Sequence, residues 1–281
     1  MNQGKKKKNH VIPGFGLTLG TTIAMLSLIV LIPLASILVY SIRMSPAEFV
    51  KLFTRPNVTH AFLVSIGCAF LAACINGLFG TVIAWVLVRY DFPGKRLIDG
   101  MIELPFALPS AVAGITLTKM YSDNGAFGRA LEQLGIQAAY SRLGIVIAMV
   151  FVGIPFVIRA EQPVLEKLSV SYEEAALMLG ASRRAVFWKV IFPEIKPALF
   201  TGFGLALARG IGEYGSVIYI SGNSEKNGTQ VVSYLIMQKL NSGNVDYEGA
   251  AALALVLLIL SFVMLFFINL VQHSASRRTG V

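Results

Sequence analysis

The sequence contains few charged residues. Asp, Glu, Lys and Arg make up 14% of its 281 positions, whereas a soluble domain of this length carries about 25%. None of the four occurs from Asn9 to Ile42, from Pro56 to Val88, or from Gly249 to Ser276. About 20 apolar residues are enough for a helix to cross the hydrocarbon core of a bilayer. The shortage of charge therefore excludes an ordinary soluble domain and predicts a protein embedded in a lipid bilayer.

Cysteine and histidine are also scarce, with two and three copies. Cys68 and Cys74 are six residues apart, which on a helix places them on nearly opposite sides and argues against a disulfide or a shared metal. The histidines are scattered at the edges of the apolar runs, so we expect no metal site. No cluster of His, Asp, Glu or Ser has catalytic spacing, and we therefore expect no catalytic residue.

The chain lacks a phosphate-binding loop of the form Gly-x-x-x-x-Gly-Lys-Ser/Thr. Its two Gly-Lys pairs, at Gly4 and Gly94, are followed by Lys6 and Arg96, where that motif requires Ser or Thr. We expect no cofactor in this chain, and any ATP hydrolysis must come from another subunit. The net charge of +9 lies beside apolar runs, which is typical of topology signals, so we expect no nucleic-acid partner.

Six apolar stretches are present once three weaker ones are counted. They predict an all-α membrane protein with spans near 17–41, 61–88, 101–121, 143–161, 198–221 and 249–271. We expect a single polytopic domain over 17–271, between a basic segment at 1–16 and a tail at 272–281. Lys and Arg are twice as frequent in the connections of one side as in those of the other. That bias predicts that both termini and the long connection after the fourth span are cytoplasmic.

The long connection, 162–196, has helix signals of its own. Ser171 and Glu174 have the spacing of a capping box, and Gly180 offers a left-handed helix end. Ser182 can cap a second helix that continues to about Phe192, before Pro193. The pattern predicts a helix–Gly–helix hairpin. It is typical either of an amphipathic pair lying on the membrane or of a docking element for a soluble partner.

The hairpin resembles a known signature. Glu174-Ala-Ala-Leu-Met-Leu-Gly180, running to Val190-Ile-Phe-Pro193, is similar to the EAA motif of ABC importer permeases, with conservative departures at Val190 and Phe192. In that family the motif forms a coupling helix that fits a cleft of the ATPase. The resemblance implies a role in coupling for seven residues, which are Glu173, Glu174, Ala175, Ala176, Gly180, Arg183 and Pro193.

Most of the chain resembles a narrower group, the sulfate/thiosulfate importer permeases of the CysT type. Leu104-Pro-Phe-Ala-Leu-Pro-Ser-Ala-Val-Ala-Gly114 and Leu207-Ala-Arg-Gly-Ile-Gly-Glu-Tyr-Gly-Ser216 are among the segments that carry this resemblance. It implies the type I importer permease fold in a bacterial plasma (inner) membrane. It also implies two ATPase subunits that bind ATP and Mg²⁺, a second homologous permease and an extracytoplasmic sulfate-binding protein. Molybdate and tungstate permeases share much of the pattern and remain the alternative.

Several residues inside the spans are candidates for the translocation path. Arg209 and Glu213 are four residues apart on one helix face, and intramembrane charges mark either a functional path or a structural ion pair. Arg159 ends the fourth span, where it can line the path or extend to the membrane surface. Pro105 and Pro109 interrupt a helix next to Ser110, and such breaks are tolerated where they line a cavity.

Two other classes of protein fit the sequence less well. A secondary transporter driven by an ion gradient would show paired inverted repeats and no docking hairpin. A membrane enzyme would show catalytic clusters, and the sequence has none. The hypothesis that we carry forward is therefore an ABC importer permease for sulfate or thiosulfate.

Overall fold

The computed structural model describes residues 15–279, with side chains to residue 272. The lysine run of the segment 1–16 and the side chains of Arg277 and Arg278 lie outside the described part. The helices are α1 (Phe15–Leu26), η1 (Ser27–Leu31), α2 (Ile32–Arg43), α3 (Pro46–Phe53), α4 (Pro56–Arg89), α5 (Lys95–Ile102), α6 (Leu104–Ala107), α7 (Ser110–Tyr121), α8 (Ala126–Glu132), α9 (Arg142–Lys167), α10 (Val170–Met178), α11 (Arg183–Val186), η2 (Phe187–Ile191), α12 (Phe192–Ile211), α13 (Val217–Ile220), α14 (Val232–Asn241) and α15 (Tyr247–Thr279).

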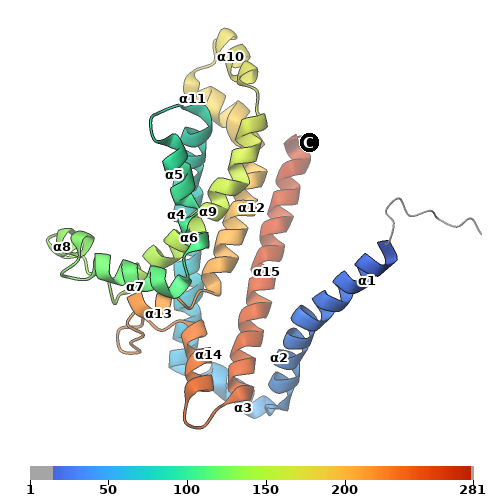
Figure 1. Cartoon of the computed structure of the whole chain (residues 1–281), viewed down its shortest axis with the longest axis vertical. Coiled ribbons are helices and arrows are strands. Elements are labelled where there is room, and N and C mark those ends of the chain that lie inside the picture. Colours follow the sequence, from blue (N-terminus) through green and yellow to red (C-terminus); the bar gives the residue numbers. More distant parts are fainter. Residues whose placement is uncertain (1–14, 280–281) are drawn as a thin grey trace, which may run out of the picture.

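The helices α4, α9 and α12 pack side by side and form the core, and α15 packs on α12 (Figure 1). Val157 of α9 lies at the centre of this packing. A Cβ atom at Gly80 of α4 would lie 2.8 Å from a Val157 methyl carbon, and one at Gly202 of α12 would lie 2.6 Å from the Val157 Cα. Small residues let helices approach closely, and this packing holds membrane bundles together.

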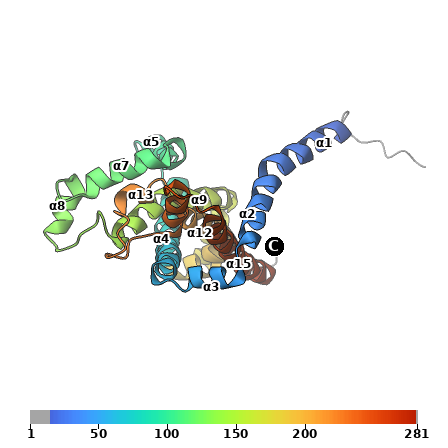
Figure 2. The same ribbon diagram turned by 90° about the horizontal axis from the view of Figure 1, so that it is seen from below.

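The first span is an arm that projects from the bundle. It runs continuously over Phe15–Arg43 through the wide turn η1, which confirms the predicted span at 17–41. Its second half, α2, packs on α15, whereas α1 has no buried residue. Figures 1 and 2 show α1 extending away from the other helices.

Five helices of the described chain are long and apolar enough to cross a membrane, and the predicted third span is different. Over Lys95–Tyr121 the chain forms two helical segments, Lys95–Ala107 and Ser110–Tyr121, that meet at 114°. The prediction of one span at 101–121 is therefore wrong in shape, and six spans result only if the bent pair counts as one. Leu108 is extended where Pro109 follows, because a proline disfavours the helical conformation of the residue before it.

The fifth span also differs from the prediction of 198–221. One apolar helical stretch covers Arg183–Ile211, through α11, η2 and α12, and it ends ten residues early. The second hairpin helix does not stop before Pro193 either, because Pro193 occupies the first turn of α12, where a missing N–H costs little. Likewise α9 continues to Lys167, so the connection between the two long helices is confined to 168–182.

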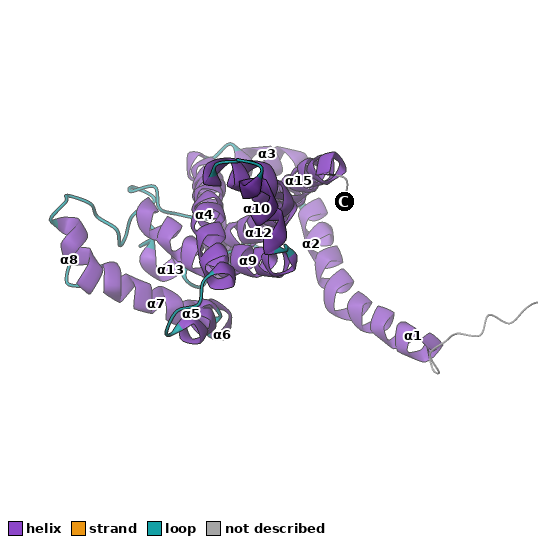
Figure 3. Ribbon diagram, turned by 90° about the horizontal axis from the view of Figure 1, so that it is seen from above, coloured by secondary structure: helices purple, strands orange, loops and turns teal. Residues whose placement is uncertain are grey.

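The two ends of the bundle are unlike each other. The hairpin with α10 caps one end, toward which α15 also runs, and α3 lies at the opposite end (Figure 1). Seen from the hairpin end, α10 lies over the bundle of α4, α9 and α12, while α5–α8 extend to one side (Figure 3). We refer below to the hairpin end and the far end.

Candidate functional site

The hairpin begins with a serine cap, although at a different residue from the predicted one. Ser169 is the N-cap of α10, and its hydroxyl accepts a hydrogen bond from the backbone N–H of Ser171 at 3.3 Å. The predicted capping box of Ser171 and Glu174 is therefore wrong. Two serines precede the same helical run, and the sequence rules do not distinguish between them.

The turn of the hairpin confirms the two other cap predictions. Gly180 has φ +84°, in the left-handed region that favours glycine, and its N–H donates to the carbonyl of Leu177. Ser182 caps α11 by accepting from the N–H of Ala185 at 3.3 Å. Together these residues reverse the chain within a few positions.

The tip of the hairpin exposes apolar side chains. Met178 and Leu179 are 88% and 89% exposed, and Glu174 and Ala175 beside them are also exposed. Ala176 is half-buried under the tip. An apolar tip with a charged neighbour is a surface suited to a protein partner, since large apolar side chains exposed together often mark an interface.

Glu173 points inward rather than outward. Its carboxylate lies 2.8 Å from the guanidinium of Arg89, at the end of α4, and the two side chains are 19% and 14% exposed. Arg89 also donates to the carbonyl of Leu168, which ends α9, at 3.1 Å. The arginine therefore joins the ends of α4 and α9 to α10. Arg183 lines a pocket in the same region, together with Glu173 and Trp85.

Arg209 and Glu213 form the ion pair that their spacing predicts. The helix ends at Ile211, so Glu213 lies in the turn that follows, where it is 1% exposed. Its other carboxylate oxygen accepts from the N–H and the hydroxyl of Ser216, both at 2.8 Å. Arg209 is 38% exposed and engages the carboxylate through Nη1. The pair thus consists of a buried anion and a partly open cation.

The broken helix lies against the same turn. A Cβ at Gly215 would come within 3.0 Å of the Ser110 side chain, and a Cβ at Gly114 would lie 2.5 Å from the Ser216 carbonyl oxygen. The start of α7 and the turn after α12 are therefore in direct contact. Of the predicted path residues, the structure brings Ser110 next to the Glu213 turn, and Pro109 lies at the bend before it. Pro105 lies in the first turn of α6 and does not interrupt the helical segment Lys95–Ala107.

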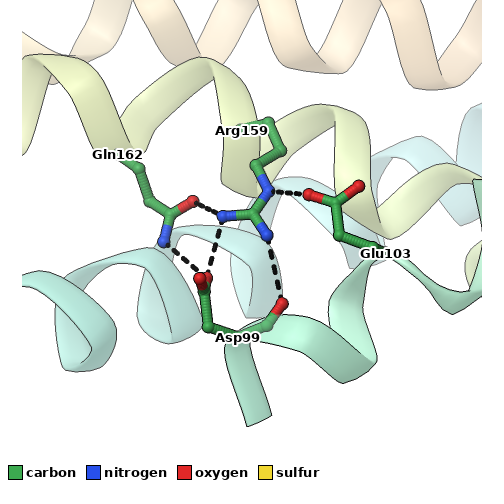
Figure 4. A network of polar contacts seen from close by, with 4 residues as sticks. All are labelled: Asp99, Glu103, Arg159 and Gln162. Atoms are coloured by element: carbon green, nitrogen blue, oxygen red, sulfur yellow. Dashed lines mark hydrogen bonds and ion pairs between the residues drawn. The ribbon is translucent and has the colours of Figure 1, made fainter. Parts of the chain in front are cut away.

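Arg159 is not part of that group. Its guanidinium contacts Asp99 and Glu103, on and after α5, and Gln162 of its own helix (Figure 4). It is half-buried in a polar network, so of its two expected roles, extension to the membrane surface does not describe it, and a place along the path stays a prediction. Asp99 and Glu103 are not among the residues predicted from the sequence, although their four-residue spacing on one helix face is a signal.

A second missed residue is Glu161, which is fully buried in α9. One of its carboxylate oxygens accepts from the hydroxyl of Thr81 in α4 at 2.8 Å, and the other has no hydrogen-bond partner among the described residues.

The chain is similar to known transport proteins. Residues 76–277 match the family model described as binding-protein-dependent transport system inner membrane component. The sequence is 46% identical over 269 residues to the sulfate transport system permease protein CysT of Salmonella typhimurium, covering 96% of each chain. It is 44% identical over 255 residues to the protein of the same name from Synechococcus elongatus, covering 91% of each chain.

Solved structures with low sequence identity share the fold. A bacterial alginate ABC transporter, in complex with an alginate pentasaccharide-bound periplasmic protein, has a chain with TM-score 0.75 and 18% identity, covering 94% of each chain. A chain of the MetNI methionine ABC transporter in an inward-facing conformation has TM-score 0.61 and 14% identity, covering 83% of this chain and 99% of that one.

Proposed function

Because the chain belongs to the family of binding-protein-dependent transport system inner membrane components, we propose that it is the permease subunit of an ATP-driven sulfate importer. The protein has the ABC importer permease fold and crosses the inner membrane several times. It is a transport subunit. The observation that supports sulfate as the substrate is the 46% identity, over 96% of the chain, to a sulfate transport permease.

The hairpin is the element that we assign to coupling with a separate ATPase. Its tip exposes Met178, Leu179 and Glu174, while Arg89 and Glu173 tie its base to the spans. An ATPase that grips the tip therefore pulls on α4 and α9 together. In this scheme two ATPase subunits bind ATP and Mg²⁺, one under each of two permeases, and the second permease is homologous to this chain.

Orientation follows from the charge bias of the connections. With the hairpin in the cytoplasm, both termini are cytoplasmic and the far end receives sulfate from an extracytoplasmic binding protein. ATP binding draws the two hairpins together and opens the paired permeases outward. Hydrolysis returns them to the inward-facing state, and the anion passes the group formed by Ser110, Arg209 and Glu213 on its way.

Uptake of labelled sulfate by cells that lack this gene, with and without the restored gene, tests the proposal. We expect uptake that requires the gene, collapses when ATP is depleted, and is inhibited by thiosulfate. Unchanged sulfate uptake with lost molybdate uptake would assign molybdate instead. Uptake that survives ATP depletion while an ion gradient remains would contradict an ATP-driven importer.

Glu174→Lys tests the docking assignment separately. The side chain is exposed and has no ion pair within the described chain, so the change should leave the spans folded. We expect membrane insertion as in the wild type together with loss of uptake. Normal uptake by this variant would remove the hairpin tip from the coupling mechanism.

A further inference from the structure

Arg159 of α9 is held by two acidic side chains from another part of the chain. Its Nε donates to the Glu103 carboxylate at 2.5 Å and its Nη1 to the Asp99 carboxylate at 2.8 Å. Nη2 donates to the backbone carbonyl of Asp99 at 3.1 Å. Gln162 completes the network by accepting from Nη1 and donating to Asp99 (Figure 4).

These contacts use most of the binding capacity of the guanidinium. It has five N–H donors, and four donor contacts are made within the network. One Arg beside one Asp and one Glu also gives a net charge of −1. In this arrangement the site repels an anion and offers it almost no donors. A dianion can bind Arg159 only after Asp99 and Glu103 have moved away.

The segment that carries the two acids makes few apolar contacts with the bundle, through Ile102 of α5 and through Phe106 of α6, whose ring lies on Phe156. The helix α5 has no buried residue, and its side chains Leu97 and Met101 are 69% and 54% exposed. The acid side chains are 42% and 49% exposed, and ion pairs this open contribute little to stability. The backbone also bends by 114° at Leu108, five residues after Glu103. Half-exposed ion pairs of this kind are therefore the main polar attachment of α5 to α9.

Arg159 lies between the Glu213 turn and the hairpin end. Gly202 packs on Val157 and Gly210 on Met149, which sets α9 and α12 in antiparallel register. In that register Arg209 lies at the same height as residue 150 of α9. Arg159 is nine residues further along α9, and at about 1.5 Å per residue this places it roughly 13 Å closer to the hairpin. An anion that moves from the far end to the hairpin end reaches the level of Arg209 first.

We propose that Arg159 is a second anion site, for a tetrahedral oxyanion, and that Asp99 and Glu103 form a gate that covers it. When α5 and α6 move away from α9, both carboxylates move away from Arg159. The guanidinium stays on α9 beside Gln162, and the N–H donors of its planar fork become accessible. That fork suits the oxygens of a sulfate-like anion. The inference rests on the proposed function and adds to it the point at which the path is closed on the hairpin side.

The test uses the assembled transporter in sealed proteoliposomes, with labelled sulfate as the probe. The variant Asp99→Asn/Glu103→Gln removes the repulsion and both charged partners of Arg159. We expect sulfate to equilibrate several-fold faster without ATP than in the wild type, and ATP-driven accumulation to fall. The matched control is Asp91→Asn, which removes the ion pair of Asp91 with Lys95 near the start of α5, away from Arg159, and should leave both rates unchanged.

A second readout does not depend on the substrate. In a background with Cys68→Ser and Cys74→Ser, Gln162→Cys places a thiol at a position that is 9% exposed. We expect a maleimide to label it several-fold faster once Asp99→Asn/Glu103→Gln is added. Equal labelling rates, or a variant without leak that accumulates sulfate as the wild type does, would overturn the gate. A wild-type transporter that takes up no sulfate contradicts the proposed substrate, and the labelling experiment then still decides on the gate.

Discussion

The guanidinium of Arg89 and the carboxylate of Glu173 lie 2.8 Å apart and join the last turn of α4 to the first turn of α10. Both side chains are largely buried, at 14% and 19% exposure. Since Arg89 also holds the end of α9 through the Leu168 carbonyl, three elements meet at one side chain. One ion pair, to Glu173, and one hydrogen bond, to Leu168, therefore link the hairpin through Arg89 to two membrane helices, in addition to the peptide chain.

Neutralising Glu173 should weaken this junction. Because the change leaves the largely buried Arg89 without its charged partner, we expect Glu173→Gln to lower stability by about 1–3 kcal/mol. The adjacent change Glu174→Gln is the matched control, because that side chain is exposed, and its effect should stay within about 0.5 kcal/mol. Thermal unfolding of the assembled complex in detergent measures both. Equal stability of the two variants would mean that the pair does not hold the hairpin.

Substitutions at Gly180 test the backbone conformation of the hairpin without changing side-chain contacts. Its φ is +84°, yet a Cβ at this position would meet no atom within 4 Å. We expect Gly180→Val to distort the turn, at a strain of about 1–2 kcal/mol, and to uncouple ATP hydrolysis from uptake. Gly180→Asn should remain close to wild type, because Asn tolerates the left-handed region. The ratio of sulfate transported to ATP hydrolysed distinguishes them, and equal ratios would contradict a conformational role.

The sequence predicts the hairpin well because its signals are local. Gly180 and Ser182 act through backbone conformation and a hydrogen bond over three residues, and both behave as expected. The cap at Ser169 was missed because Ser171, two residues later, satisfies the same rule. Composition likewise predicts that most of the chain is helical and spans a membrane, since charge-free runs of this length have few other solutions.

The rest depends on contacts between distant segments, which the sequence does not specify. Arg159 draws its acids from positions 56 and 60 residues earlier. No local pattern pairs them. The fifth span ends at Ile211 because Gly212, Glu213 and Ser216 form a turn around the buried carboxylate, although the apolar run continues to Ile220. From hydropathy alone, that turn is predicted to be part of a membrane helix.

Asn76 of α4 makes Gly153 of α9 intolerant of a side chain. A Cβ at 153 would lie 2.5 Å from the Asn76 amide group, which is 1% exposed. We expect Gly153→Ala to cost about 1–3 kcal/mol by overpacking, measured by thermal unfolding of the complex. Gly67→Ala, on α4 with nothing within 4 Å, is the control and should be neutral or stabilising by up to about 1 kcal/mol. Adding Asn76→Ala to Gly153→Ala should recover part of the lost stability. If stability does not recover, the clash at position 153 is with another residue.

Arg209 and Glu213 differ in what they can offer to an anion. Glu213 is buried and both of its carboxylate oxygens are used, by Arg209 and by Ser216, so it offers nothing to a substrate. Arg209 is 38% exposed and makes its contact to Glu213 through Nη1, which leaves donors on its open side. We therefore expect Glu213 to position Arg209 and Arg209 to contact the anion.

Single and double substitutions separate these two roles. Glu213→Gln leaves Arg209 without its counter-ion and Arg209→Gln leaves a buried carboxylate unpaired, so each should destabilise the complex. The double variant removes both charges, and its stability should recover by a coupling free energy of about 1–3 kcal/mol. Sulfate uptake should not recover with it, because the contact to the anion is gone. A double variant that is stable and also transports sulfate would instead make the pair a purely structural link between α12 and the turn before α13.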